Sequence, residues 1–248
     1  MNDYKISIII PCYNAEKWIE ECVSSVFEQK YKDIELIVVD NESTDDSVKI
    51  LKDLQSSGMD FTLSSAPNLY PHCWDEARAV GFELATGDYF LTMCSDDYIH
   101  PDFVYNCVAF LNLFEEAPKA IQSPIRGVKD DNTFTPYFSP LQKHMYSDLS
   151  EFKKLCLTRC PVNTPSVVFH RSLYEKGLLS TQPELYGGAA DYDLYCRLAH
   201  NNVFIVPSPN WLGYYYRWHQ EQATWGVISS GRNYDQQIRS YWDNQWKS

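Results

Sequence analysis

The sequence has few basic residues. Its 248 residues include 21 Lys and Arg against 33 Asp and Glu, which gives a formal net charge of -12 and a pI of about 4.9. Binding to a polyanion requires a basic surface, so no nucleic-acid partner is expected. A small anionic ligand remains compatible with this charge, because a bound divalent cation reverses the local electric field.

Long apolar runs and paired cysteines are also missing. No stretch approaches the eighteen apolar residues of a transmembrane helix, and the opening MNDYKISIII is too short for a signal peptide. The eight cysteines are scattered without a CxxC pair, which argues against a zinc cage or a disulfide scaffold. Free thiols in a reducing compartment are expected, and so is a cytoplasmic location, with contact to the inner face of a membrane as an alternative.

The first hundred residues alternate strand-like and helix-like patterns. Short apolar runs predict strands at 5–10, 34–39, 61–63 and 89–93. Helical spacing predicts helices at 15–29 and 74–85, with another between the second and third strands. We expect Asn14 to cap the first helix, and Ser43 or Thr44 to cap the second. This alternation predicts an α/β fold with a mostly parallel sheet between helices, where ligands collect at the carboxyl ends of the strands.

Beyond residue 115 the pattern is less regular. Residues 122–148 are rich in Pro, Asp, Asn and Ser and are predicted to be loop and irregular strand. Further strands are expected at 165–169, 203–206 and 212–216, and helices at 171–176 and 189–200. There is no internal repeat and no flexible linker, so we expect one domain, 1–248, with two unequal halves.

Two adjacent acids follow the fourth predicted strand, in the sequence TMCSDDY at 92–98. One interpretation is that Asp96 and Asp97 merely cap a helix near Pro101. Their position at the end of a strand favours another, because Mg²⁺ or Mn²⁺ binds one or two carboxylates and completes its shell with phosphate oxygens. Asp40, which follows the second strand, is either a helix cap or a hydrogen-bond acceptor for a base or ribose.

Four segments, in order, resemble an inverting, family 2-type glycosyltransferase of the GT-A fold. The stretch SIIIPCYNAEKWIEECVSSVFEQKYKDIELIVVDNESTDDSVKIL is similar to the start of that family. EARAVGFELATGDYFLTMCSDDYIHPDF resembles the segment leading to its DxD-type metal motif. GGAADYDLYCRLA is similar to its catalytic-base segment, and YYYRWHQEQAT to its C-terminal strand and turn. The resemblance spans roughly residues 7 to 224 and assigns nucleotide binding to about 1–115. It assigns acceptor binding to about 116–248, which includes an aromatic tail.

The resemblance also implies residue roles. The residues that match its donor-binding positions are Pro11, Tyr13, Asn14, Glu16, Asp40, Arg78, Asp96 and Asp97. Among these, Asp40 would read the base, typically uracil, and Arg78 would lie near the base or phosphates. Asp96 would contact ribose or sugar hydroxyls, and Asp97 would bind Mn²⁺ or Mg²⁺. His219 is given a lesser role near the metal or phosphates.

Asp191 matches the general base of the family. Inversion requires the acceptor hydroxyl to attack opposite the departing nucleotide, while a carboxylate takes its proton. Asp191 and Asp193 are two residues apart on a predicted helix, so only one is expected to face the acceptor. Asp191 is favoured because Gly187 and Gly188 precede it, although a helix cap is the alternative. Arg217 is either a structural residue or a phosphate ligand.

Some positions depart from the family pattern. Asn41 and Glu42 replace a common Asp-Gly pair, Ala79 replaces an Asn, Cys94 replaces an acid, and Ala190 replaces a Glu. The predicted activity is still metal-dependent, inverting transfer from a nucleotide-sugar, with a UDP-sugar favoured, to a hydroxyl of a glycan or lipid-linked sugar. A non-catalytic nucleotide or sugar binder of the same fold is the alternative.

The aromatic C-terminal residues allow three interpretations. They form a packed core, or a stacking surface for acceptor sugars, or, through Trp242 and Trp246, a tail at a membrane interface.

Overall fold

The computed structural model describes residues 3–69, 75–135, 146–222 and 234–247. It contains a seven-stranded sheet in the order β3-β2-β1-β4-β8-β6-β9. The strands are β1 (Ile6–Cys12), β2 (Ile34–Asp40), β3 (Thr62–Ser65), β4 (Tyr89–Thr92), β6 (Ala120–Gln122), β8 (Val167–His170) and β9 (Ile205–Pro207). Four of the pairings are parallel and the two made by β8 are antiparallel, so the predicted α/β fold with a mostly parallel sheet is confirmed.

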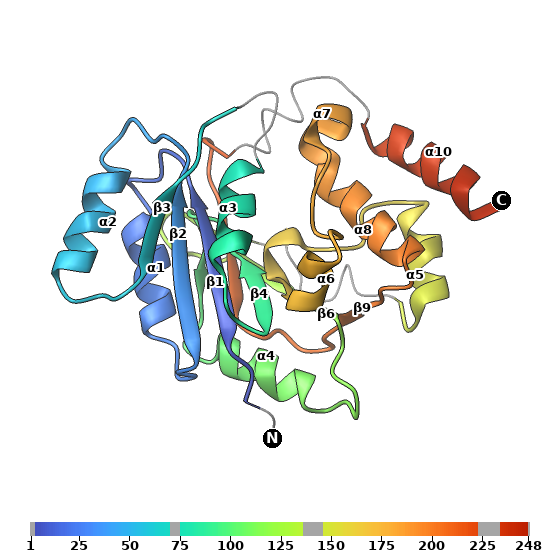
Figure 1. The fold of residues 1–248 in the computed structure, drawn as a ribbon, viewed down its shortest axis with the longest axis horizontal. Helices are drawn as coiled ribbons and strands as arrows, with labels where there is room; N and C mark the ends of the chain where they lie inside the picture. The colour runs from blue at the N-terminus through green and yellow to red at the C-terminus, as the bar shows by residue number, and fades with distance from the viewer. Residues whose placement is uncertain (1–2, 70–74, 136–145, 223–233, 248) are drawn as a thin grey trace.

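Helices cover both faces of this sheet (Figure 1). They are α1 (Ile19–Phe27), α2 (Ser47–Ser56), α3 (Glu76–Leu84), α4 (Phe103–Leu111), α5 (Leu149–Cys156), α6 (Arg171–Glu175), α7 (Pro183–Tyr186), α8 (Ala190–His200) and α10 (Tyr234–Lys247). Figure 1 shows α7, α8 and α10 together on one side of the molecule, with α1 and α2 on the other.

The alternation of side chains along β1 divides the core in two. Ile8 and Ile10 point into a core with α1, α2 and α4, whereas Ile9 points into a second core with α3, α8 and α10. The second core is tight at α3, because a Cβ on Gly81 would lie 2.2 Å from Cγ2 of Ile9. Both faces of β1 are therefore buried, which explains its uninterrupted apolar sequence.

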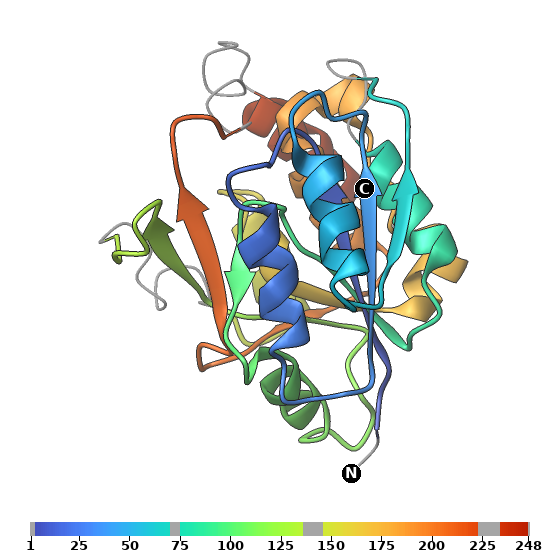
Figure 2. The same cartoon turned by 90° about the vertical axis from the view of Figure 1, so that its left-hand side faces the viewer.

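A second, three-stranded sheet has the order β5-β10-β7, from Tyr98–Ile99, Tyr214–Trp218 and Ile125–Lys129. Figure 2 shows β10 and β7 side by side at the edge of the molecule. Strand β10 is antiparallel to β5 and parallel to β7, so it joins the segment after β4 to a region that the sequence predicted to be irregular.

Several local predictions were wrong. Helix α1 begins at Ile19 rather than near residue 15, and α2 begins at Ser47, so neither Asn14 nor Ser43 nor Thr44 caps a helix. Helices α5, α7 and α10 and strands β5 and β6 were not predicted, and β7 lies in the segment predicted to be loop and irregular strand.

Two predicted absences are consistent with the structure. Within the described residues, no helix is both long and apolar enough to cross a membrane. The cysteines in that part of the chain carry free thiols; Cys73 lies outside the described residues.

Candidate active site

Asp97 is turned into the protein. Its side chain is on a residue only 1% exposed, and it accepts hydrogen bonds from the Tyr214 hydroxyl to Oδ2 and from the Arg217 backbone N–H to Oδ1, each at 2.8 Å. Burial, and then the charge of Asp96, raise the pKa of Asp97 well above its ordinary value. Asp97 thus anchors β10 to the end of β4.

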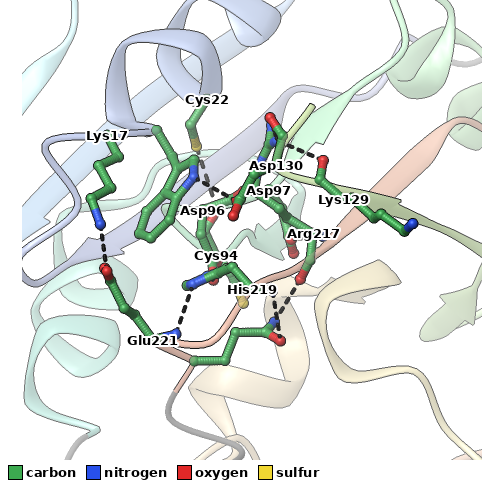
Figure 3. Close-up of polar contacts among 12 residues, drawn as sticks. Lys17, Cys22, Cys94, Asp96, Asp97, Lys129, Asp130, Arg217, His219 and Glu221 are labelled. Atoms are coloured by element: carbon green, nitrogen blue, oxygen red, sulfur yellow. Dashed lines mark hydrogen bonds and ion pairs between the residues drawn. The ribbon is translucent and has the colours of Figure 1, made fainter. Parts of the chain in front are cut away.

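Asp96 lies on the more open side of the same turn. Its Oδ2 atom is 2.8 Å from Nε2 of His219, and the His219 ring packs against the Trp18 ring in a tilted arrangement with centroids 4.0 Å apart. One ligand atom from each of Cys94, Asp96 and Asp97 falls within 4.8 Å of the others. Figure 3 shows Cys94, Asp96 and His219, from two distant parts of the chain, brought together. This site offers oxygen, nitrogen and sulfur donors.

Arg217 stabilises the turn that carries Asp96 and Asp97. Its side chain is 1% exposed, its Nε donates to the backbone oxygen of Asp96 at 2.8 Å, and its Nη2 pairs with Glu21 at 2.5 Å. Nη1 donates to Asn132 at 3.0 Å. A guanidinium so enclosed is not open to a phosphate, so the structure favours the structural alternative for Arg217.

The loops after β1 and β2 are bound to each other. The Asn14 N–H donates to the Ser43 hydroxyl at 3.0 Å, while the Asn14 side chain accepts from the Thr44 N–H at 2.8 Å. The Glu16 carboxylate accepts from the Asp46 N–H at 2.9 Å. Asn14 has a positive φ of 48°. These contacts replace the predicted helix caps, because the side chains bridge two loops instead of closing a helix end.

The other predicted donor-binding residues lie at the same edge of the sheet. Asp40 ends β2, opposite Cys12 in the register, and its carboxylate accepts from the Ser43 N–H at 3.2 Å. Pro11 is half-buried within β1, and Tyr13 beyond it is 51% exposed. The Tyr13 ring is therefore open to a ligand at the carboxyl ends of the parallel strands, whereas Asp40 is 8% exposed and its carboxylate is bonded to the Ser43 N–H.

Arg78 is directed to a different part of the molecule. Its Nε is 2.6 Å from Asp75, and its Nη2 donates to the backbone oxygen of Leu179 at 3.1 Å. Asp75 also accepts from the Thr181 N–H, so Arg78 and Asp75 join α3 to the segment that leads to α7. Burial raises the pKa of Asp191, and the charge of Arg78 is one of the influences that oppose this rise.

Asp191 is the second residue of α8. Its Oδ2 accepts a hydrogen bond from the Thr164 hydroxyl, and its Oδ1 accepts from the Tyr192 N–H at 2.7 Å. Burial raises the pKa of Asp191 above its ordinary value, and the Thr164 hydrogen bond opposes that rise. A carboxylate with a raised pKa is a stronger base, so this environment suits proton abstraction.

Asp193 faces away from Asp191. Its residue is 2% exposed, and its Oδ1 accepts from the indole N–H of Trp242 at 2.9 Å. Trp242 is itself 5% exposed, so this ring lacks the exposed face that a membrane contact requires. The packed-core interpretation therefore holds for Trp242.

Sequence reasoning missed some residues of the site. Trp18, Thr164 and Tyr214 contact His219, Asp191 and Asp97 respectively. Tyr214 was noted only as part of an aromatic run. No local signal marks Thr164, because its contact depends on a short 3-10 turn, Thr164–Ser166, lying against α8.

The class of protein follows from the fold and from comparison with known families. Residues 7–180 match the model of the family described as "Glycosyl transferase family 2", so the chain belongs to that family. An uncharacterized glycosyltransferase of Haemophilus influenzae is 40% identical over 103 residues, covering 41% of this chain and 40% of its own length. Another, from Rickettsia conorii, is 26% identical over 215 residues, covering 82% of this chain and 31% of its own. The chain thus spans well under half of these relatives.

Solved structures agree on the fold. The structure of residues 1–349 of TarS from S. aureus, in complex with UDP-GlcNAc, has a TM-score of 0.69 and 22% identity, covering 92% of this chain and 61% of that one. The mannosyltransferase PcManGT from Pyrobaculum calidifontis, in complex with GDP-Man and Mn²⁺, has a TM-score of 0.65 and 17% identity, covering 93% and 62%. The predicted family and the GT-A fold are confirmed.

Proposed function

We propose that this chain transfers a sugar, with inversion, from a UDP-sugar to a hydroxyl of a glycan or lipid-linked sugar. The observation that carries the proposal is the difference between the two adjacent acids. Asp97 is locked into β10, whereas Asp96 is left beside His219 at the carboxyl end of β4. The contacts of Asp97 with β10 stabilise the fold, whereas the fold does not require the contact of Asp96 with His219.

A divalent metal fits the contact between Asp96 and His219. Asp96 and His219 would hold Mn²⁺ or Mg²⁺, with the Cys94 sulfur as a further donor; Asp97, to which the resemblance assigns the metal, lies in the same cluster with its carboxylate bonded to β10. When bound, the metal supplies positive charge to the departing diphosphate. The mixed donor set favours Mn²⁺ over Mg²⁺, because Mg²⁺ prefers oxygen ligands throughout.

The remaining roles belong to residues of this chain. Asp40 would accept hydrogen bonds from the base, and Tyr13 would lie against the base. The hydrogen bonds that Asn14 and Glu16 make to the loop after β2 would fix the shape of the loop after β1. Asp191, held by the Thr164 hydroxyl, would take the proton from the acceptor hydroxyl as the new bond forms. The UDP-GlcNAc complex of TarS supports a UDP-sugar as the donor.

Calorimetry with UDP, and with GDP as a control nucleotide, tests the donor site. Binding of UDP should require Mn²⁺ and should be lost in Asp96→Ala. Asp191→Asn should still bind UDP, but it should not hydrolyse the UDP-sugar that the wild type hydrolyses. Metal-independent UDP binding would contradict the metal site. Binding with no turnover of any UDP-sugar by the wild type would favour the non-catalytic alternative.

A further inference from the structure

Helix α10 meets the chain on both sides of Asp191. The ring of Tyr234 lies against Gly187, four residues before Asp191, and the indole of Trp242 is bonded to Asp193, two residues after it. Ile238 lies between them in sequence and is fully buried. These three residues are spaced by four, so one face of α10 supplies all of them.

The contact at Gly187 is close. A Cβ there would lie 2.7 Å from the Tyr234 ring, and Gly187 has φ +49°, a conformation that other residues rarely adopt. Gly187 opens the 3-10 turn Gly187–Ala189, which leads directly into α8. The position of the Tyr234 ring therefore limits where the chain enters the helix that carries Asp191.

The contact at Asp193 is a buried hydrogen bond. The 2.9 Å bond from Trp242 holds a carboxylate that is also 3.8 Å from Nε of Arg197. Without the indole N–H, a buried carboxylate oxygen would lose a donor, at a cost that favours movement of the first turn of α8. Asp191 lies in that same turn.

We propose that α10 is a positioning element for the general base, with Trp242 and Asp193 as positioning residues. This proposal rests on the proposed function, in which Asp191 takes the acceptor proton. The aim of a base matters because a misplacement of about 1 Å costs roughly 100-fold in rate. The donor-binding loops do not share this dependence, since they lie at the ends of β1 and β2, on the other side of the molecule from α10 (Figure 1).

The test compares Trp242→Phe with Trp246→Phe. Both variants keep an aromatic ring on α10, but the indole nitrogen of Trp246 has no hydrogen-bond partner among the described residues. With a UDP-sugar that the wild type hydrolyses, Trp242→Phe should lower kcat at least tenfold, with the UDP Kd within twofold. Trp246→Phe should change neither quantity. Asp193→Asn, which keeps an oxygen acceptor for the indole, should retain most of the activity.

Two further measurements separate positioning from loss of structure. Amide hydrogen exchange of residues 187–193 should be faster in Trp242→Phe than in Trp246→Phe, at a temperature where both are folded. Tyr234→Ala, on a half-buried residue, should lower kcat in the same way if Trp242→Phe does not fold.

The possible outcomes are distinct. If the wild type hydrolyses the donor and Asp191→Asn does not, but Trp242→Phe equals the wild type, this inference fails alone. An equal fall in UDP affinity and kcat, or an equal loss in Trp246→Phe, would also overturn it. If Asp191→Asn is as active as the wild type, the proposed function fails instead.

Discussion

Replacing each of the two adjacent acids should give different results. Asp97→Ala removes the acceptor for two buried donors, the Tyr214 hydroxyl and the Arg217 N–H, both at 2.8 Å. A buried donor left without a partner costs about 1–3 kcal/mol, so the loss should be about 2–6 kcal/mol. At about 2–4 °C for each kcal/mol in a domain of this size, Tm should fall by roughly 4–24 °C.

Asp96→Ala should affect ligand binding more than stability. Asp96 is partly exposed and its carboxylate has one side-chain partner, the buried His219 ring, so its loss should cost less, about 1–3 kcal/mol of the free energy of unfolding. It should instead abolish Mn²⁺-dependent UDP binding. Asp97→Asn is the matched control, because one carboxamide oxygen can still accept one of the two hydrogen bonds, and its Tm should fall between those of Asp97→Ala and the wild type.

Thermal unfolding and calorimetry on the same samples decide the matter. The reasoning would be refuted if Asp97→Ala kept the wild-type Tm and lost only metal-dependent binding. It would equally be refuted if Asp96→Ala lowered Tm as much as Asp97→Ala while still binding UDP with Mn²⁺.

Three other predictions concern the base, the metal and the core. In the proposed function Asp191 acts unprotonated; because burial raises its pKa above 3.8, kcat should fall as pH falls through that higher value. Thr164→Val removes a hydrogen bond that lowers this pKa, so the acid limb of the pH–kcat profile should move to higher pH; an unmoved limb contradicts this. Co²⁺ should give a sulfur-to-metal charge-transfer band that Cys94→Ser abolishes, and a band that persists would rule out the sulfur as a ligand. Gly81→Ala should destabilise the protein by about 1–3 kcal/mol in urea unfolding, since its Cβ meets buried Ile9, and an unchanged midpoint would contradict the packing.

The N-terminal half of the fold was predictable because its pattern is local. Ile8, Ile10 and their neighbours form an unbroken apolar run, and such a run in a strand indicates burial on both faces. Helix α10 was missed although Tyr234, Ile238 and Trp242 carry a four-residue spacing. Most of the residues between them are polar, so the apolar residues are too few for the helical spacing to stand out in the sequence.

From the sequence, Asp40 and the pair Asp96–Asp97 were expected at the carboxyl ends of the strands, but not the direction in which each acid turns. Which of Asp96 and Asp97 turns inward is decided by Tyr214 and Arg217, residues more than a hundred positions further along the chain. Asp191 and Asp193 also differ through distant partners, because the Thr164 hydroxyl bonds to Asp191 and the Trp242 indole bonds to Asp193. Local sequence cannot express choices that depend on partners so distant.

Strand β10 has a consequence for the order in which the protein folds. It lies between β5 and β7, so both of those strands lack a neighbour in this sheet until residues 214–218 have left the ribosome. Until then β5 and β7 present open edges. The carboxylate of Asp97 also lacks both of its hydrogen-bond donors, the Tyr214 hydroxyl and the Arg217 N–H. A nascent or truncated chain that contains Asp96 and Asp97 but ends before residue 214 is therefore expected to be aggregation-prone, and its proposed metal site would lack His219.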